Sequence, residues 1–281
     1  MSARPHRISV VIPTSGRPSL AAVQVGLSVQ SVVPQEICVI VDRDRRGPGW
    51  ARNRGMERAG GDIIALLDDD TVPPPDWLAS MVSALDETGA DCAGGSFLET
   101  DPLLNDVRNT RPLPCERILD GFGLVGNSGN LVLRRTVVDA MRDRHGHVFI
   151  ESWGRYGSED WELIMRIRGA GFRLVYVPVH VRHLRRVTVA GYFRHQFFRG
   201  IGVALLHRSI RRHGPGASPQ QSILWDPERS RAERLLNVFK AKVLGPLNAG
   251  AFRERKHFLI HWTAEKFQSL GYLWGTIRHG R

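Results

Sequence analysis

The stretch Ile63-Ile64-Ala65-Leu66-Leu67-Asp68-Asp69-Asp70 decides the fold. Its five consecutive apolar residues predict a strand that is buried on both faces, and three aspartates end that strand abruptly. Short apolar runs of the same kind occur at 8–12, 36–41 and 91–95. Helical spacing is seen between the runs at 19–30, 48–59 and 75–88. This alternation predicts an α/β fold with a mostly parallel sheet that is flanked by helices on both faces.

The pattern becomes less regular after the fourth apolar run. Residues 100–125 are rich in Pro, Asn and Gly and predict a long loop of the kind that often carries function. Beyond this loop we expect a helix over 159–169 and a pair of strands around 173–181.

The last hundred residues differ in character from the rest. They predict amphipathic, arginine-rich helices at 187–213, 228–244 and 252–275, with a Pro/Gly/Ser linker near 214–222. We therefore expect two domains, a sheet-containing domain over 1–184 and a basic helical region over 185–281.

Charge is divided along the same line. The chain of 281 residues has a net charge of +11. Residues 1–181 contain 20 Lys and Arg against 23 Asp and Glu, whereas residues 182–281 contain 19 against 5. A mildly acidic body with a strongly basic tail suggests an anionic partner for the tail. The 42% hydrophobic content excludes a disordered chain.

Cysteine content and hydropathy indicate the compartment. The three cysteines are an odd number without a CxxC pair, which argues against a disulfide framework and against a thiolate zinc site. The apolar run after the basic N-terminus is too short for a signal peptide, and no window reaches the length of a membrane-spanning helix. We expect a cytoplasmic protein, peripheral at the inner face of the cell membrane if the tail binds lipid.

Polar residues follow three of the predicted strands. Pro13-Thr14 ends the first, Asp42 the second, and Asp68-Asp69-Asp70 the third. In open α/β sheets the ligand lies at these carboxyl ends. Asp68 and Asp70 are two residues apart on an extended backbone, so they could share a Mg²⁺ or Mn²⁺ ion. The alternative is a solvated acidic turn that caps the next helix.

Two further groups carry candidate chemistry. Glu159-Asp160 begins a helix, where an acid either caps the N-terminus or serves as a general base for an acceptor hydroxyl. His180 and His183 end a strand, where a histidine is either structural or an imidazole ligand beside the acidic cluster.

These motifs, taken in order, resemble family 2 glycosyltransferases of the Rossmann-like GT-A fold from Ile8 to about Leu184. Ser9-Val10-Val11-Ile12-Pro13-Thr14 is similar to the opening strand whose end contacts the nucleotide base. Asp42 matches the acid that meets the base or the ribose. Ala51-Arg52-Asn53-Arg54-Gly55 is similar to the family's Ala-Arg-Asn-x-Gly stretch, which implies that Arg52 lies near the donor nucleotide.

The resemblance also implies roles for the acidic residues. Leu67-Asp68-Asp69-Asp70 resembles the DxD motif, with Asp68 near the ribose and the metal and Asp70 ligating the ion. Glu159-Asp160 resembles the ED motif, with Asp160 as catalytic base and Glu159 as a positioning acid. His183 lies where the family places a third metal ligand, and His180 fits that spacing less well.

One more segment and two departures complete the resemblance. The segment Asn127–Arg135 is similar to the one that lines the donor-sugar pocket, which makes Asn130 a donor contact. Asp42-Arg43-Asp44-Arg45 replaces the usual Asp-Asp-Gly-Ser, so the base preference is open. Gln196-Phe197-Phe198-Arg199-Gly200 resembles the Gln-x-x-Arg-Trp motif of processive synthases, with Gly200 in place of Trp.

The resemblance implies an inverting, metal-dependent glycosyltransferase that uses a nucleotide-sugar donor, with a UDP-sugar as first guess and Mn²⁺ or Mg²⁺ as cofactor. The acceptor hydroxyl would belong to a lipid-linked molecule, a cell-envelope glycan or a secondary metabolite. For the tail we expect an anionic membrane surface first, then another protein or a second copy of the chain, and no nucleic acid. The alternatives are a catalytically silent nucleotide-sugar-binding or scaffold protein and a nucleotidyltransferase.

Overall fold

The computed structural model describes residues 6–109, 118–119, 122–123, 127–154, 156–213 and 253–279. The chain divides into two compact units, the first formed by 1–100 and 112–186 and the second by 101–111 and 187–281. The segment Asp101–Arg111 thus belongs to the second unit. The expected division into 1–184 and 185–281 places this segment in the first domain. The helix expected at 228–244 and the linker near 214–222 lie outside the described residues.

The first unit is built on a seven-stranded sheet with the order β2-β1-β3-β8-β5-β9-β4. Its strands are β1 (Ile8–Thr14), β2 (Glu36–Val41), β3 (Ile63–Leu67), β4 (Thr71–Val72), β5 (Cys92–Glu99), β8 (Asn130–Arg134) and β9 (Leu174–His183). Strands β1, β2, β3, β5 and β9 run in one direction, whereas β8 and β4 run against their neighbours. The predicted α/β class is confirmed, with a sheet that is mixed. β6 (Ile118–Leu119) and β7 (Phe122–Gly123) pair separately.

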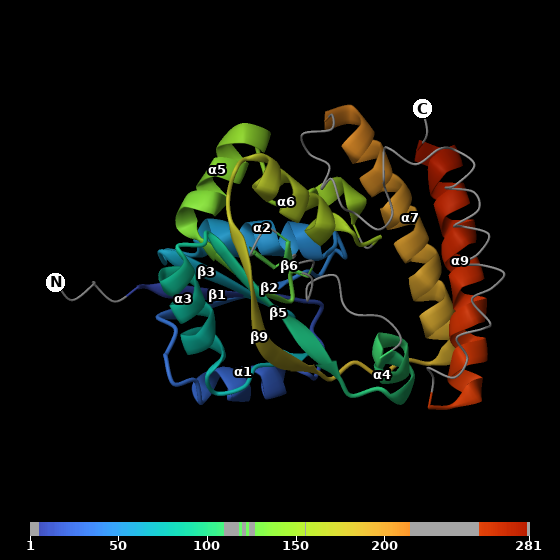
Figure 1. The fold of residues 1–281 in the computed structure, drawn as a ribbon, viewed down its shortest axis with the longest axis horizontal. Helices are drawn as coiled ribbons and strands as arrows, with labels where there is room; N and C mark the ends of the chain where they lie inside the picture. Colours follow the sequence, from blue (N-terminus) through green and yellow to red (C-terminus); the bar gives the residue numbers. More distant parts are fainter. Residues whose placement is uncertain are drawn as a thin grey trace. The chain divides into compact units, whose positions relative to one another are not determined.

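Helices cover both faces of this sheet (Figure 1). One apolar cluster joins α1 (Leu20–Ser28) and α3 (Trp77–Thr88) to the sheet. A second cluster joins α2 (Pro48–Arg58), α5 (Arg135–His145) and α6 (Glu159–Gly169) to the opposite face. Since residues of β3 alternate between the two clusters, its continuous apolar run is explained by burial on both sides.

Two expectations for the first unit are corrected. Strand β9 is a single ten-residue strand, where a pair of strands was expected. Its register against β5 shifts between Gly94 and Ser96, so the extra residues around Pro178 are accommodated as a bulge instead of a turn. Strand β8 and helix α5 were not predicted as elements, because Leu131-Val132-Leu133 is too short an apolar run to stand out in the sequence.

The second unit contains α4 (Pro102–Asn109), α7 (Val189–His213) and α9 (Arg255–His279). Residues 102–109 form a helix where a loop was expected. The Asp101 carboxylate accepts hydrogen bonds from the backbone N–H groups of Leu103 and Leu104, at 3.0 and 3.2 Å, and thereby caps this helix. The helix is tied to α9 by the buried pair of Asp106 Oδ2 and His257 Nδ1, 2.7 Å apart.

Helices α7 and α9 lie side by side (Figure 1) and are in backbone contact at two glycines. A Cβ atom at Gly200 would lie 2.0 Å from the carbonyl oxygen of Gln268, and one at Gly271 would lie 1.9 Å from that of Phe197. A side chain at position 200 would therefore push the helices apart. This contact explains why glycine stands at the position where the motif of processive synthases has tryptophan. No helix in the described ranges is long and apolar enough to cross a membrane.

Candidate functional site

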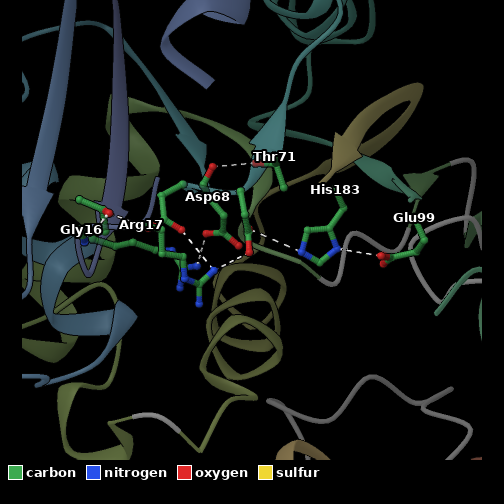
Figure 2. A network of polar contacts seen from close by, with 10 residues as sticks. Gly16, Arg17, Asp68, Thr71, Glu99 and His183 are labelled. Carbon is green, nitrogen blue, oxygen red and sulfur yellow. Dashed lines mark hydrogen bonds and ion pairs between the residues drawn. The ribbon is translucent and has the colours of Figure 1, made fainter. Parts of the chain in front are cut away.

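The three aspartates after β3 make different contacts. Thr14 Oγ1, at the end of β1, donates a hydrogen bond of 2.6 Å to Asp69 Oδ2. The Arg17 guanidinium pairs with both Asp69 and Asp70, and Figure 2 shows it reaching across from the loop after β1. Burial raises the pKa of Asp69, against the opposing hydrogen bond from Thr14. Asp69 therefore holds the loop after β1 against the cluster, which leaves Asp68 and Asp70 as the candidates for chemistry.

Arg52 on α2 connects this cluster to the Glu159-Asp160 pair. Its Nη2 lies 2.7 Å from Asp68 Oδ1, and its Nη1 lies 3.0 Å from Glu159 Oε1. The side chain is only 5% exposed. Burial lowers the pKa of Arg52, but the charges of Asp68 and Glu159 outweigh that effect and raise it. The family resemblance predicts that Arg52 lies near the donor nucleotide, and the structure adds this bridge between the two acidic motifs.

Asp160 lies next to this bridge in the first turn of α6. Its Oδ1 accepts a hydrogen bond of 2.8 Å from the backbone N–H of Trp161. Burial and the charge of Glu159 raise the pKa of Asp160 to about 7. A carboxylate with such a pKa is well suited to general-base catalysis near neutral pH. Since Glu159 is paired with Arg52, the two acids of the motif have separate environments.

His183 ends β9 beside the aspartates. Its Nε2 lies 3.5 Å from Asp70 Oδ1, and its Nδ1 lies 2.9 Å from Glu99 Oε2 (Figure 2). Strand pairing explains this placement, because His183 is in register with Thr71 on one side and with Glu99 on the other. Burial lowers the pKa of His183, but the hydrogen bonds to Asp70 and Glu99 outweigh it and raise the pKa to about 9.

Glu99 is a site residue that sequence reasoning missed. By fixing Nδ1 it turns Nε2 of His183 toward Asp70, as carboxylates that hydrogen-bond to the free ring nitrogen do for metal-bound histidines. In the sequence, Glu99 is marked only by its position at the end of strand β5. This position does not reveal that β5 and β9 are neighbours in the sheet.

The kind of ligand atom that the side chains offer decides whether a metal ion fits this site. Within the described ranges, no group of three or more His, Cys, Asp and Glu side chains is arranged to hold an ion. Asp70 Oδ1 and His183 Nε2 converge and would supply one oxygen and one nitrogen ligand. That pair fits Mn²⁺ better than Mg²⁺, which prefers oxygen alone. The carboxylate of Asp68 is directed to Arg52 instead, so its predicted role as a metal ligand stays a prediction.

Four other predicted residues occupy positions near the strand ends. Pro13 is buried in β1, opposite Ile40. The Asp42 carboxylate accepts hydrogen bonds from the backbone N–H groups of Arg46 and Gly47, at 2.9 and 2.7 Å. Asn130 is fully buried and accepts from Trp77 Nε1, while its own amide donates to the carbonyl oxygens of Ser96 and Val179. His180 bonds to Ser96 Oγ. These bonds support positioning roles, and the predicted donor contacts of Pro13, Asp42 and Asn130 stay predictions.

Gly129, in the turn before β8, borders the site directly. A Cβ atom at this position would lie 2.5 Å from Asp68 Oδ2 and 3.0 Å from Phe97 Cζ. Only glycine therefore leaves room for the Asp68 carboxylate in its present position.

Comparisons with known proteins agree with the fold. Residues 25–146 match the family model "Glycosyl transferase family 2". "Glycosyltransferase AglE" of Haloferax volcanii is 38% identical over 64 residues, which are 23% of this chain and 21% of the relative. "Glucosyl-dolichyl phosphate glucuronosyltransferase" of the same organism is 31% identical over 58 residues, 21% of this chain and 18% of the relative. The chain thus spans about a fifth of the length of either relative.

Among solved structures, the chain is similar to a mannosyltransferase from Pyrobaculum calidifontis in complex with GDP-Man and Mn²⁺. The TM-score is 0.61 at 15% identity, over 97% of this chain and 88% of that one. At this identity the likeness shows a shared GT-A fold.

Proposed function

We propose, from the match of residues 25–146 to the family 2 model, that this chain is a family 2 glycosyltransferase that transfers a sugar from a nucleotide diphosphate donor to an acceptor hydroxyl with inversion at the anomeric carbon. The observation that carries the proposal is the Arg52 bridge between Asp68 and Glu159, beside which Asp160 lies with a raised pKa. The bridge joins the motif expected to bind the donor to the motif expected to activate the acceptor.

The reaction needs a base on the acceptor side. In the proposal the Asp160 carboxylate accepts the proton of the acceptor hydroxyl as its oxygen attacks the anomeric carbon. One displacement with one base inverts that carbon. Glu159 is held by Arg52 and is thereby kept from competing for the proton. Arg52 is fully charged, so it also offsets the repulsion between the carboxylates on its two sides.

The donor side needs positive charge near the diphosphate. Asp70 and His183 would hold a divalent ion, which, when bound, neutralises charge on the departing nucleoside diphosphate. Arg17 pairs with Asp70 in this structure and is placed to exchange that carboxylate for a phosphate oxygen when the donor binds. Glu99 keeps the imidazole of His183 oriented toward Asp70.

The rate of transfer is expected to depend on pH through Asp160. Only its ionised form accepts a proton, and its pKa is raised to about 7. We therefore expect kcat/KM to rise with pH up to about 7, to change about tenfold per unit well below that value, and to level off above it. Initial rates at subsaturating donor and fixed free metal measure this profile. A rate that is flat from pH 5 to 8 would contradict the assignment.

The Gly129→Ala variant is expected to weaken donor binding. The added methyl group would overlap with the Asp68 carboxylate and move it from Arg52. Displacements of this size cost between about tenfold and a hundredfold in kcat/KM. Donor titrations and steady-state kinetics measure the effect. Gly60→Ala is the matched control, because its Cβ atom would lie 3.6 Å from the nearest atom, and this variant should behave as wild type. Equal kinetics of the two variants would show that the position of Asp68 is unimportant.

For the acceptor we propose a lipid-linked sugar or polyprenyl phosphate. One relative with a similar segment bears the name "Glucosyl-dolichyl phosphate glucuronosyltransferase". The basic charge of residues 182–281 is consistent with a phosphate-bearing acceptor. Glycans of the cell envelope and secondary metabolites remain the alternatives from the sequence. The raised pKa of Asp160 beside the Arg52 bridge speaks against a silent binding protein, since binding a donor needs no base.

Thermal stabilisation by nucleotide sugars tests the donor class. UDP-, GDP- and dTDP-sugars are compared with and without Mn²⁺, using the wild-type chain and the Asp70→Asn variant. The proposal expects that nucleotide sugars with one of the three nucleobases raise the unfolding temperature. This increase should require Mn²⁺ and should be absent in the Asp70→Asn variant. Stabilisation by free nucleoside triphosphates but by no nucleotide sugar would favour a nucleotidyltransferase instead.

A further inference from the structure

Helix α9 carries an exposed row of large apolar side chains, which we call the α9 stripe. It consists of Leu259, Trp262, Leu270, Leu273, Trp274 and Ile277. Their exposed fractions range from 37% at Trp262 to 72% at Ile277. At 100° per residue all six lie within about 60° of one line along the helix, and at 1.5 Å per residue the line is about 27 Å long. These six side chains thus lie along one side of the helix, with Lys266 between Trp262 and Leu270.

Most of the stripe is distinct from the face that packs α9 within its unit, while Trp274 at its edge also contacts α7, where its ring centroid lies 6.4 Å from that of Phe197. Ala264, Gly271 and Gly275 on the other side of the helix are buried, and both glycines lie against α7. Phe267 on that side stacks on Phe193 of α7, with ring centroids 4.9 Å apart. Helix α9 therefore has one apolar face that is used in folding and a second one that is exposed. Large exposed apolar patches commonly mark an interaction surface.

The charged residues along the stripe are cations. Arg255 and Lys256 lie at its N-terminal end, and Lys256 pairs with Glu254 at 2.6 Å. Lys266 Nζ lies 4.8 Å from the ring centroid of Trp262, and the Arg278 guanidinium lies 4.8 Å from that of Trp274. Each tryptophan of the stripe thus carries a cation over its ring.

The acidic residues are placed away from the stripe. Glu265 is the only acid between residues 255 and 279, and it lies about 120° around the helix from Leu259. It is 3.7 Å from His261 on the same turn of the helix. A partner of this surface would therefore meet apolar groups and positive charge, and the one acid at its N-terminal end, Glu254, is already paired with Lys256.

We propose that the α9 stripe docks on an anionic lipid surface, with the helix lying in the plane of the interface. Leucine and isoleucine side chains would enter the acyl region, and the tryptophans would lie at headgroup depth, where such rings are enriched. Lys266 and Arg278 extend from the rings toward the phosphates, as long cationic side chains do at interfaces. The net charge of +14 over residues 182–281 adds long-range attraction to such a surface.

The positive charge along the stripe favours an anionic lipid surface over the other possible partners. A second copy of the chain would place cations against cations along the stripe. Nucleic acid would match the cations but would leave the leucines and the isoleucine without an apolar partner. An anionic bilayer satisfies both parts of the surface at once. The inference does not depend on the proposed glycosyl transfer, because it concerns the second unit alone and can be tested without a donor.

Vesicle flotation with the full chain tests this proposal. Vesicles of phosphatidylcholine alone are compared with vesicles that contain phosphatidylglycerol, at low and at high salt. We expect flotation with the anionic vesicles at low salt, weaker flotation at high salt, and little with the neutral ones. The Leu270→Glu/Ile277→Glu double variant should lower the partition coefficient by about tenfold or more. Both positions are more than half exposed, so the variant should fold.

The matched control applies the same change on the other unit. Val25→Glu on α1 replaces a side chain that is 65% exposed, and this variant should float as wild type does. Three results would overturn the proposal: no flotation with anionic vesicles at low salt, unchanged flotation of the double variant, or equal flotation with neutral and anionic vesicles. A concentration-dependent dimer that the double variant loses, without vesicle binding, would assign the stripe to a second copy.

Discussion

The Asp160→Asn variant is expected to lose transfer activity by roughly 10²- to 10⁴-fold while it binds the donor nearly as tightly as wild type. The amide keeps the size of the side chain and its contact with the backbone N–H of Trp161, but it cannot accept the proton of the acceptor hydroxyl. Steady-state kinetics and donor titration by calorimetry measure the two quantities separately. Asp44→Asn is the matched control, since this side chain is 73% exposed, and it should keep full activity.

Stability distinguishes a lost base from a lost fold in this variant. The folded-state pKa of Asp160 is raised to about 7 from a reference of 3.8, so its carboxyl stabilises the fold below the reference value and loses that contribution as the pH rises through 7. Removing the titrating group should therefore leave the unfolding temperature above pH 7 unchanged or higher. Transfer at the wild-type rate by Asp160→Asn would show that another residue is the base.

Replacing Arg52 should have the second largest effect, on stability as well as on activity. In Arg52→Met the Asp68 and Glu159 carboxylates lose their shared cation, and Glu159 has only 8% side-chain exposure. Removing one partner of such a buried network costs about 3 kcal/mol or more in the free energy of unfolding. Urea titration measures this loss. The Arg52→Met/Glu159→Gln double variant should recover part of it, because the buried charge is then gone as well.

The pH profile shows whether Arg52 acts on the base or only on the fold. Its positive charge lowers the pKa of Asp160, opposing burial and the charge of Glu159. Without this cation the acid limb of kcat/KM should move to higher pH. Arg52→Lys keeps the positive charge, so the acid limb of its kcat/KM profile should stay near that of wild type. One of the two hydrogen bonds, to Asp68 or to Glu159, is lost in this variant. Identical profiles for the Met and Lys variants would contradict an electrostatic role of Arg52 toward Asp160.

The sequence predicts those parts of the site that depend on local pattern. Buried strands that end in polar residues reveal Thr14 and the aspartates of β3, since the carboxyl ends of strands in such a fold meet at one edge. Glu159 and Asp160 stand out as a pair of acids that opens a helix. The family resemblance then puts them in order, and the match of residues 25–146 to the family model and the shared fold agree with that resemblance.

The remaining features depend on contacts between distant segments. The Arg52 bridge spans 107 residues to Glu159, and the Glu99–His183 contact requires β5 and β9 to be neighbours. A pattern along the chain does not show which side chain meets which across a sheet. The same holds for Gly200, which looks like a departure from a motif until its contact with Gln268 on another helix is known.

The release of nucleoside diphosphate from nucleotide sugars tests the central claim most directly. Wild-type protein is incubated with UDP-, GDP- or dTDP-sugars, with or without Mn²⁺, and the product is quantified by chromatography. The expected result is slow hydrolysis of nucleotide sugars that carry one particular nucleobase. This hydrolysis should require Mn²⁺ and should be absent in the Asp70→Asn variant. No release from any nucleotide sugar with Mn²⁺, or equal release with and without the metal, would contradict a metal-dependent transferase built on Asp70 and His183.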